Sequence, residues 1–266
     1  MGQDFKKLNI FTDLCPCNSG RTIANCCFAE VNTTPPGLKT GYSHPKCYAR
    51  NLGDCSPTIS KEHYISRGLL NIFEGNTFKV LGFPWIDKDK SQKLTKNTLT
   101  SNILCQRHNS ALSGLDTLAK KFFSFVLART EDQWALIIRG YEIERWMLKV
   151  YCGLLSSGMI KNKGSFLPKI LPSNDFLNTL FYRKEIPTGR GLAFVLHRDL
   201  ESRKGSISIR PLIHDSIGLI GISIQLEFFN IVMSFGYISN SNNETEKSKG
   251  IRYHPESVSI QDNFGY

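Results

Sequence analysis

The chain has 266 residues, of which 41% are hydrophobic, enough to bury a conventional core in one large or two modest domains and to exclude wholesale disorder. Its formal net charge of +10 favours association with a polyanion such as nucleic acid, although a basic protein without such a partner has the same composition. No segment approaches the roughly 18 consecutive apolar residues of a membrane span, and the first residues lack the apolar core of a secretory signal. We therefore expect a cytoplasmic protein that does not contact a membrane.

Seven of the eight cysteines precede residue 106 and fall into two clusters. In a reducing compartment, cysteines at such close spacing indicate metal binding rather than disulfide bonds. The eighth, Cys152, lies in an apolar stretch and is expected to be a buried thiol.

The first cluster occupies residues 13–30 and holds four thiols across a short loop, enough to complete a tetrahedral zinc site. So small a module has almost no core, and zinc binding would supply its folding free energy. The alternative is a redox role for the two adjacent cysteines. The expected zinc ligands are Cys15, Cys17, Cys26 and Cys27.

Residues 14–28 resemble the SEC-C motif, a zinc-binding element appended to many bacterial proteins, except that Asn18 stands where a glycine is usual. The resemblance implies a structural module that docks to a protein partner, and we assign residues 1–32 to it. The next segment, residues 32–37, contains two prolines and a glycine. It predicts a linker or turn, with a domain boundary between residues 32 and 44.

The second cluster combines three cysteines and a histidine, which predict a second structural zinc site with no position open for water. Between the ligand pairs we expect a β-hairpin, with a strand near residues 77–81, that leads into a helix beginning at residue 109 or 110. This domain would span residues 44–118. Its expected zinc ligands are Cys47, Cys55, Cys105 and His108.

The order of a ligand pair, an acid–histidine pair, an asparagine, a second ligand pair and a helix resembles the zinc-stapled HNH endonuclease family, with its ββα-metal fold. The resemblance implies that His63 is the general base that activates water against a DNA phosphodiester. It implies that Glu62 and Asn109 ligate a catalytic Mg²⁺ or Mn²⁺, and that Asn102 orients the histidine.

The sequence departs from the family pattern in three ways. Seven residues separate the first two cysteine ligands instead of the usual two, His108 replaces a cysteine, and 38 residues separate His63 from Asn102. The long spacing also makes Asn97 a rival for the position of Asn102. An insertion in the hairpin would hold four lysines near a DNA backbone or, alternatively, on an ordinary solvated face. These are Lys88, Lys90, Lys93 and Lys96.

Each proposed site residue also has a simpler interpretation. His63 could ligate zinc or lie on the surface, and Asn109 could cap the following helix. Asp116 could be an acid on a helix surface or a support for the site, and the first is expected.

The rest of the chain carries no motif with a known chemistry. Apolar residues recur at helical spacing up to Val126 and again from Trp134 to Val150, which predicts two packed helices. β-rich runs at residues 192–196, 206–209, 218–229 and 231–235 predict an antiparallel sheet, and the polar residues 239–249 a mobile tail. We assign residues 119–266 to an α+β domain that selects a target or senses a signal.

The sequence thus predicts an α+β protein built from a zinc module, a ββα-metal nuclease core, and a helical pair with an antiparallel sheet. The resemblance implies a metal-dependent HNH DNA endonuclease, of the kind found in restriction and antiviral defence. One alternative is a non-catalytic, zinc-dependent nucleic-acid-binding or adaptor protein. A nuclease that is silent until a partner engages the first module is another.

Overall fold

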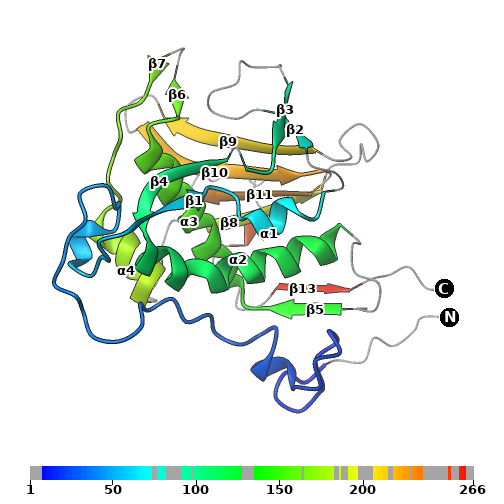
Figure 1. Cartoon of the computed structure of the whole chain (residues 1–266). Coiled ribbons are helices and arrows are strands. Elements are labelled where there is room, and N and C mark those ends of the chain that lie inside the picture. The colour runs from blue at the N-terminus through cyan, green and yellow to red at the C-terminus, as the bar shows by residue number, and fades with distance from the viewer. Residues whose placement is uncertain are drawn as a thin grey trace, which may run out of the picture.

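The computed structural model describes residues 8–73, 77–81, 91–97, 99–127, 135–162, 165–182, 186, 191–196, 206–214, 218–227, 229–235, 251–252 and 258–261. The protein is a mixed α+β fold, which confirms the expected class (Figure 1). Its helical segments are η1 (Ile23–Asn25), η2 (Arg50–Leu52), α1 (Arg67–Leu70), α2 (Gln106–Val126), α3 (Gly140–Ser157) and α4 (Asn174–Tyr182).

The strands form one large sheet and three smaller pairs. The large sheet has the order β12-β8-β11-β10-β9-β2-β3, and all of its pairs are antiparallel except β2 with β9. Its strands are β2 (Thr77–Leu81), β3 (Ser91–Thr95), β8 (Gly191–Leu196), β9 (Ser206–His214), β10 (Gly218–Leu226), β11 (Phe229–Ser234) and β12 (Ile251–Arg252). The pairs are β1 (Ile59–His63) with β4 (Thr100–Cys105), β5 (Ala135–Ile138) with β13 (Val258–Gln261), and β6 (Lys161–Asn162) with β7 (Ser165–Phe166).

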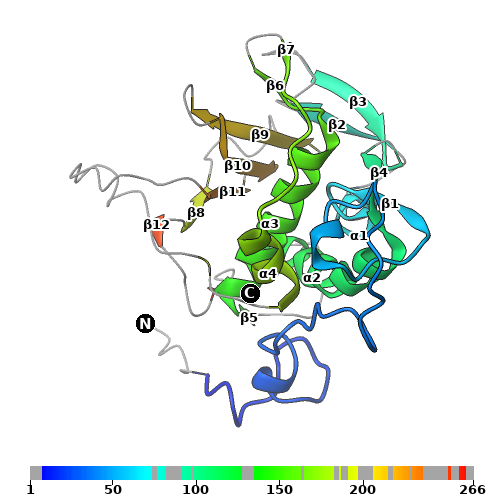
Figure 2. The ribbon, with the colours of Figure 1, turned by 90° about the vertical axis from the view of Figure 1, so that its left-hand side faces the viewer.

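Strands β8 to β11 of the large sheet and the β1–β4 hairpin lie on opposite sides of α3, and β2 and β3 lie on the same side as the hairpin (Figure 2). Aromatic side chains join the helices to the sheet. Phe123 of α2 lies edge-on to Trp146 of α3 at 5.5 Å between ring centroids, and Phe122 lies 5.7 Å from Phe229 of β11. All four side chains are buried, so the helices and the sheet share one hydrophobic core.

The hairpin insertion contributes two strands to the large sheet. Strands β2 and β3 lie between β1 and β4 in the sequence, yet β2 pairs in parallel with β9 through Val80 and Ile207. The expected strand at residues 77–81 is therefore present, but of its two neighbours only β3 is close in sequence, and β9 lies more than 120 residues further along the chain. The domain boundary expected at residue 118 lies inside α2, whose apolar face continues to Phe125.

The second predicted helix differs from the structure at its start. Residues 135–138 form strand β5, and the helix begins only at Gly140. All four residues of β5 are buried, and β5 pairs with β13. A short run of apolar residues fits a strand buried on both faces as well as a helix, so periodicity alone could not separate them. Trp134 and the tail at residues 239–249 lie outside the described residues.

The expected linker is a strap that is bound to the body of the protein. Arg145 of α3 donates to the carbonyl of Val31 at 3.0 Å and to the hydroxyl of Thr33. Thr33, which is fully buried, donates in turn to the carbonyl of Leu180 in α4 at 2.7 Å. Buried polar groups that are paired in this way hold a segment in place rather than leave it free.

Two residues of α2 also hold this strap. Gly114 faces it so closely that an added Cβ would lie 2.7 Å from the side chain of Val31. Arg107 donates to the carbonyl of Pro36 at 2.5 Å and forms an ion pair with Asp54 at 2.9 Å. The strap therefore joins the first cysteine cluster, which lies below α2 in Figure 1, to the second.

Candidate functional site

The second cluster comes together at the junction of β4 and α2. Cys105 ends the strand and precedes the first residue of the helix, and His108 lies in the first helical turn. Cys47 and Cys55 come from the loop around η2, which pairs with β4 through a hydrogen bond from the Tyr48 amide to the Ile103 carbonyl. The cluster therefore joins a loop to a strand–helix junction.

The geometry of this quartet fits a metal ion. One ligand atom from each of the four residues lies within 4.8 Å of the others, and all four residues are buried. The Nδ1 atom of His108 lies 3.2, 3.6 and 3.8 Å from the sulfurs of Cys105, Cys47 and Cys55. Hydrogen bonds from Cys47 and His108 lower the pKa of the Cys105 thiol to about 2. Three sulfurs and one nitrogen are a donor set that suits zinc.

The first cluster also brings its four sulfurs within 4.8 Å of one another. Ser19 donates to the sulfur of Cys26 at 3.0 Å, and the sulfurs of Cys17 and Cys26 are 3.3 Å apart. Burial opposes ionisation of Cys17, but hydrogen bonds from Ser19 and the neighbouring thiols lower its pKa to about 6. None of the eight cysteines forms a disulfide in this structure.

Asn18 has a positive φ of 57°, in the left-handed region. The SEC-C motif usually has glycine at this position, and asparagine is among the few other residues that adopt this conformation readily.

Strands β1 and β4 pair antiparallel, from Ile59 opposite Cys105 to His63 opposite Thr100, and α2 follows directly. This is the strand–strand–helix order that the resemblance predicts. A bulge between Ser60 and Glu62 interrupts the pairing. A bulge changes the direction of the side chains beside it, so the side chains of β1 do not alternate regularly between Ser60 and Glu62. The order of elements alone does not identify a nuclease.

The structure gives Glu62 a partner that the sequence did not predict. Its carboxylate lies 2.8 Å from the ammonium of Lys149 in α3, and the two side chains are 4% and 1% exposed. The same ammonium lies 2.7 Å from both carboxylate oxygens of Asp116 in α2. Lys149 therefore occupies the space between two carboxylates that a divalent cation would need. The residues at Glu62, as arranged, do not fit Mg²⁺ or Mn²⁺.

The charges of this triad depend on one another. Burial alone would lower the pKa of Lys149, but the carboxylates of Glu62 and Asp116 raise it above its ordinary value. Burial raises the pKa of Glu62, and Lys149 opposes that rise. Lys149 is charged, because it has carboxylate oxygens within hydrogen-bond distance on two sides.

His63 lies at the end of β1, half-buried, and its Nε2 atom is buried without a hydrogen-bond partner. Burial lowers the pKa of the imidazole, and the nearby charges of Lys149 and Arg67 lower it further. The ring is therefore neutral at neutral pH and can accept a proton.

The structure places the two asparagines apart from this triad. Asn102 is exposed on β4, and Asn109 is half-buried in the first turn of α2. Among the described residues, neither forms a hydrogen bond with His63. Asn109 and Asp116 are seven positions apart in α2 and so share one face of the helix. The expectation that Asp116 is an ordinary surface acid is wrong, because it is bound to Lys149.

Two of the four lysines of the insertion are described. Lys93 is exposed on β3 directly opposite Lys79 of β2, and Lys96 donates to the carbonyl of Phe73 at 2.8 Å. Lys88 and Lys90 lie outside the described residues.

Sequence reasoning missed Lys149, the residue that decides the chemistry around Glu62. The available signal was a lysine at the centre of a helix whose flanking residues, such as Leu148 and Val150, are apolar and buried. A charged residue in such a helix needs a buried partner of opposite charge.

Comparison with known proteins finds no family model that matches the chain, and no curated protein or solved structure shows significant similarity to it. In the part of the chain that the structure describes, no helix is long and apolar enough to cross a bilayer.

Proposed function

We propose that the chain is an HNH-type DNA endonuclease, in which a structural zinc site holds a ββα unit and His63 is the general base. The observation that carries the proposal is the quartet of Cys47, Cys55, Cys105 and His108 at the junction of β4 and α2. It ties together the hairpin and the helix that the resemblance requires. A second structural zinc bound by the first cluster is part of the same proposal.

The state of His63 suits the role of a base. Its lowered pKa keeps the ring neutral, although Nε2 is buried and a water would reach it only after a local rearrangement. A neutral imidazole can accept the proton of a water that attacks a phosphodiester, a contribution of about 10²–10⁴-fold in rate.

The divalent cation expected from the resemblance does not fit at Glu62, because Lys149 already neutralises that carboxylate. The proposal therefore includes no step through a cation. Lys149 is buried between two carboxylates, so it supplies no net positive charge for a phosphate.

The buried ion pair also favours a second candidate function, a non-catalytic, zinc-dependent nucleic-acid-binding or adaptor protein. In that case Glu62 and Lys149 hold β1 to α3 and have no catalytic role. In both functions the first module would dock to a protein partner, and defence against foreign DNA is the biological setting that we propose with the nuclease.

Cleavage of supercoiled plasmid by the zinc-loaded protein tests the proposal, with Mg²⁺, with Mn²⁺ and with neither. We expect cleavage by the wild type and a loss of about 10²-fold or more in His63→Ala. The matched control is Ser113→Ala, at an exposed, uncharged position of α2, which should cleave as the wild type does. Zinc content and melting temperature are compared for all three proteins.

The results separate the two candidate functions. Equal cleavage by the wild type and a folded His63→Ala variant would exclude His63 as the base. DNA binding without cleavage in all metal conditions would favour the non-catalytic function. Cleavage that requires Mg²⁺ or Mn²⁺ would show that a cation binds despite the ion pair between Glu62 and Lys149.

A further inference from the structure

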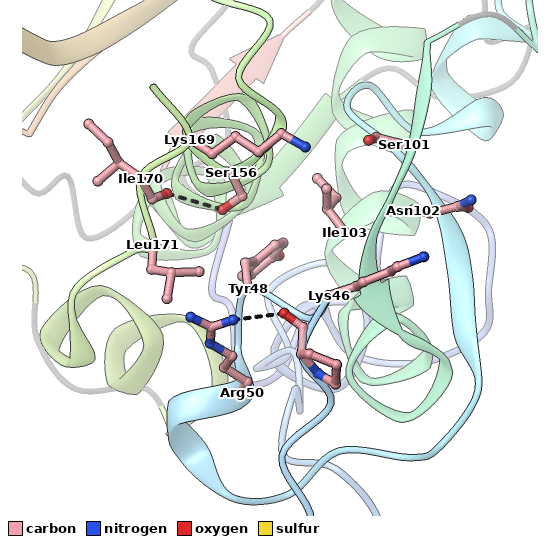
Figure 3. Close-up of a pocket in the computed structure, with 11 residues that line it drawn as sticks. Lys46, Tyr48, Arg50, Ser101, Asn102, Ile103, Ser156, Lys169, Ile170 and Leu171 are labelled. Carbon is pink, nitrogen blue, oxygen red and sulfur yellow. Dashed lines mark hydrogen bonds between the residues drawn. The ribbon is translucent and has the colours of Figure 1, made fainter. Parts of the chain in front are cut away.

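A cleft of about 590 Å³ opens beside the hairpin, on the side of β4 (Figure 3). Four segments form it: residues 45–50 near η2, residues 101–103 of β4, Ser156 near the end of α3, and residues 169–171. The volume lies within the range of about 300–1,000 Å³ that is typical of ligand sites. The cleft is therefore large enough for a ligand of many atoms rather than a single small ion.

The charges around the cleft have one sign. Lys46, Arg50 and Lys169 line it, and no carboxylate is present among its described lining residues. None of the three forms a salt bridge with a described carboxylate, and Arg50 donates to the carbonyl of Pro45 at 2.7 Å. Lys46 and Lys169 are exposed. Three cations that have no counter-charge among the described residues favour a ligand with several negative charges.

The uncharged part of the cleft combines apolar surface with hydrogen-bonding groups. Ile170 and Leu171 are 48% and 38% exposed and give the cleft an apolar side. Asn102, from β4, offers both donors and acceptors. The hydroxyl of Tyr48 is buried without a hydrogen-bond partner, and its ring forms part of the floor.

We propose that this cleft binds one strand of a nucleic acid. Its phosphates would lie on Lys46, Arg50 and Lys169, and a base would lie against Ile170 and Leu171. A phosphate or sulfate ion alone would make no use of the apolar side. A nucleotide unit carries both the negative charge and the flat apolar face that the two sides of the cleft match.

The position of the cleft relates it to His63. Ser101 lines the cleft and is paired with Glu62, and the preceding residue, Thr100, is paired with His63. Paired residues of antiparallel strands lie about 4.5–5.5 Å apart between Cα atoms. A strand bound in the cleft thus lies against the same hairpin that carries the proposed base. This inference deepens the proposed function, on which its choice of a nucleic acid as ligand rests.

Binding of a fluorescently labelled single-stranded oligonucleotide to the zinc-loaded, full-length protein tests the cleft. Fluorescence anisotropy would compare the wild type with Lys46→Glu/Lys169→Glu. A control, Lys120→Glu/Arg210→Glu, makes the same change in charge at exposed positions of α2 and β9. We expect the affinity to fall at least tenfold in the cleft variant and less than threefold in the control.

Salt dependence gives a second, quantitative measure. Loss of two phosphate contacts should reduce the slope of log K against log salt by about 1.4 for a single strand. The control variant should keep the slope of the wild type. Asn102→Ala, which keeps the charge of the cleft, should change the preference among homopolymeric oligonucleotides with little change in the slope.

Two outcomes would overturn the proposal. Equal losses in the two charge-reversed variants would show that the protein attracts nucleic acid through its overall charge rather than through the cleft. Equal competition by polyglutamate would show that the cleft binds acidic peptides. The result is independent of cleavage, because His63→Ala should keep full binding even if the wild type cleaves no substrate.

Discussion

Replacement of Lys149 by methionine tests the ion triad of Glu62, Lys149 and Asp116 directly. Methionine keeps a long unbranched side chain and removes the charge together with the hydrogen-bond donors of the ammonium. Glu62 would then be a buried carboxylate with 4% exposure and no cation, close to a second carboxylate at Asp116. We expect a large loss of stability, because the uncompensated buried charge must either stay ionised at high cost or take up a proton.

The magnitude follows from burial. Removal of one partner from a fully buried ion pair costs about 3–5 kcal/mol, and the pair of Lys149 with Glu62 meets that condition. Asp116 adds less, because its side chain is 26% exposed and solvent screens its charge. A loss of about 3 kcal/mol should lower the melting temperature by roughly 6–12 °C in a protein of this size.

Urea unfolding of the zinc-loaded protein measures the loss, and Lys120→Met on the exposed surface of α2 is the matched control. The control should change the free energy of unfolding by less than about 0.5 kcal/mol. Addition of Glu62→Gln to Lys149→Met should recover about 2 kcal/mol, because the carboxylate that needs the cation is then absent.

The dependence on pH gives a further check. Without Lys149, burial raises the pKa of Glu62 with nothing to oppose it. A folded-state pKa above the unfolded value means that the folded state holds the proton more tightly, so stability falls as pH rises. The Lys149→Met variant should therefore lose less stability at pH 5 than at pH 8. A loss below 1 kcal/mol at both values would refute the buried triad.

Two other perturbations test the zinc sites and the strap. Elemental analysis should find two zinc ions per chain in the wild type and one in either Cys26→Ser or Cys105→Ser. Only Cys105→Ser should strongly lower the melting temperature of the protein's α+β body. Two zinc ions in either variant would contradict the proposed ligands. Gly114→Leu should displace the strap at Val31 and expose residues 30–40 to limited proteolysis. Ser113→Leu, at an exposed position, should not. If residues 30–40 resist the protease equally in both variants, the close packing of Gly114 on Val31 is contradicted.

The ligand clusters could be predicted from the sequence because cysteine and histidine at close spacing have few other uses. Cys105 and His108 are three residues apart, so a helical turn brings them together. A tetrahedral zinc site requires four ligands, and Cys47 and Cys55 were the remaining candidates for the other two. The β-rich runs and their antiparallel pairing could be predicted for a similar reason, since alternation and turns are local properties.

The partners of Glu62 could not be predicted in this way. Its ion pair with Lys149 joins residues of a strand and a distant helix, and nothing in the local sequence of either one specifies the other. The strap was interpreted as a linker because of its prolines, but the groups that bind it, such as Arg145, lie in α3. Local patterns predict elements, whereas contacts between them depend on the whole fold.

The parallel pairing of β2 with β9 has a consequence for how the chain is made. Residues 77–81 leave the ribosome long before residues 206–214, so β2 must wait for its neighbour while most of the protein is synthesised. Until then its edge is open to pairing with other chains. A fragment that ends after α2 would keep that open edge permanently, and would therefore aggregate more readily than the full-length protein.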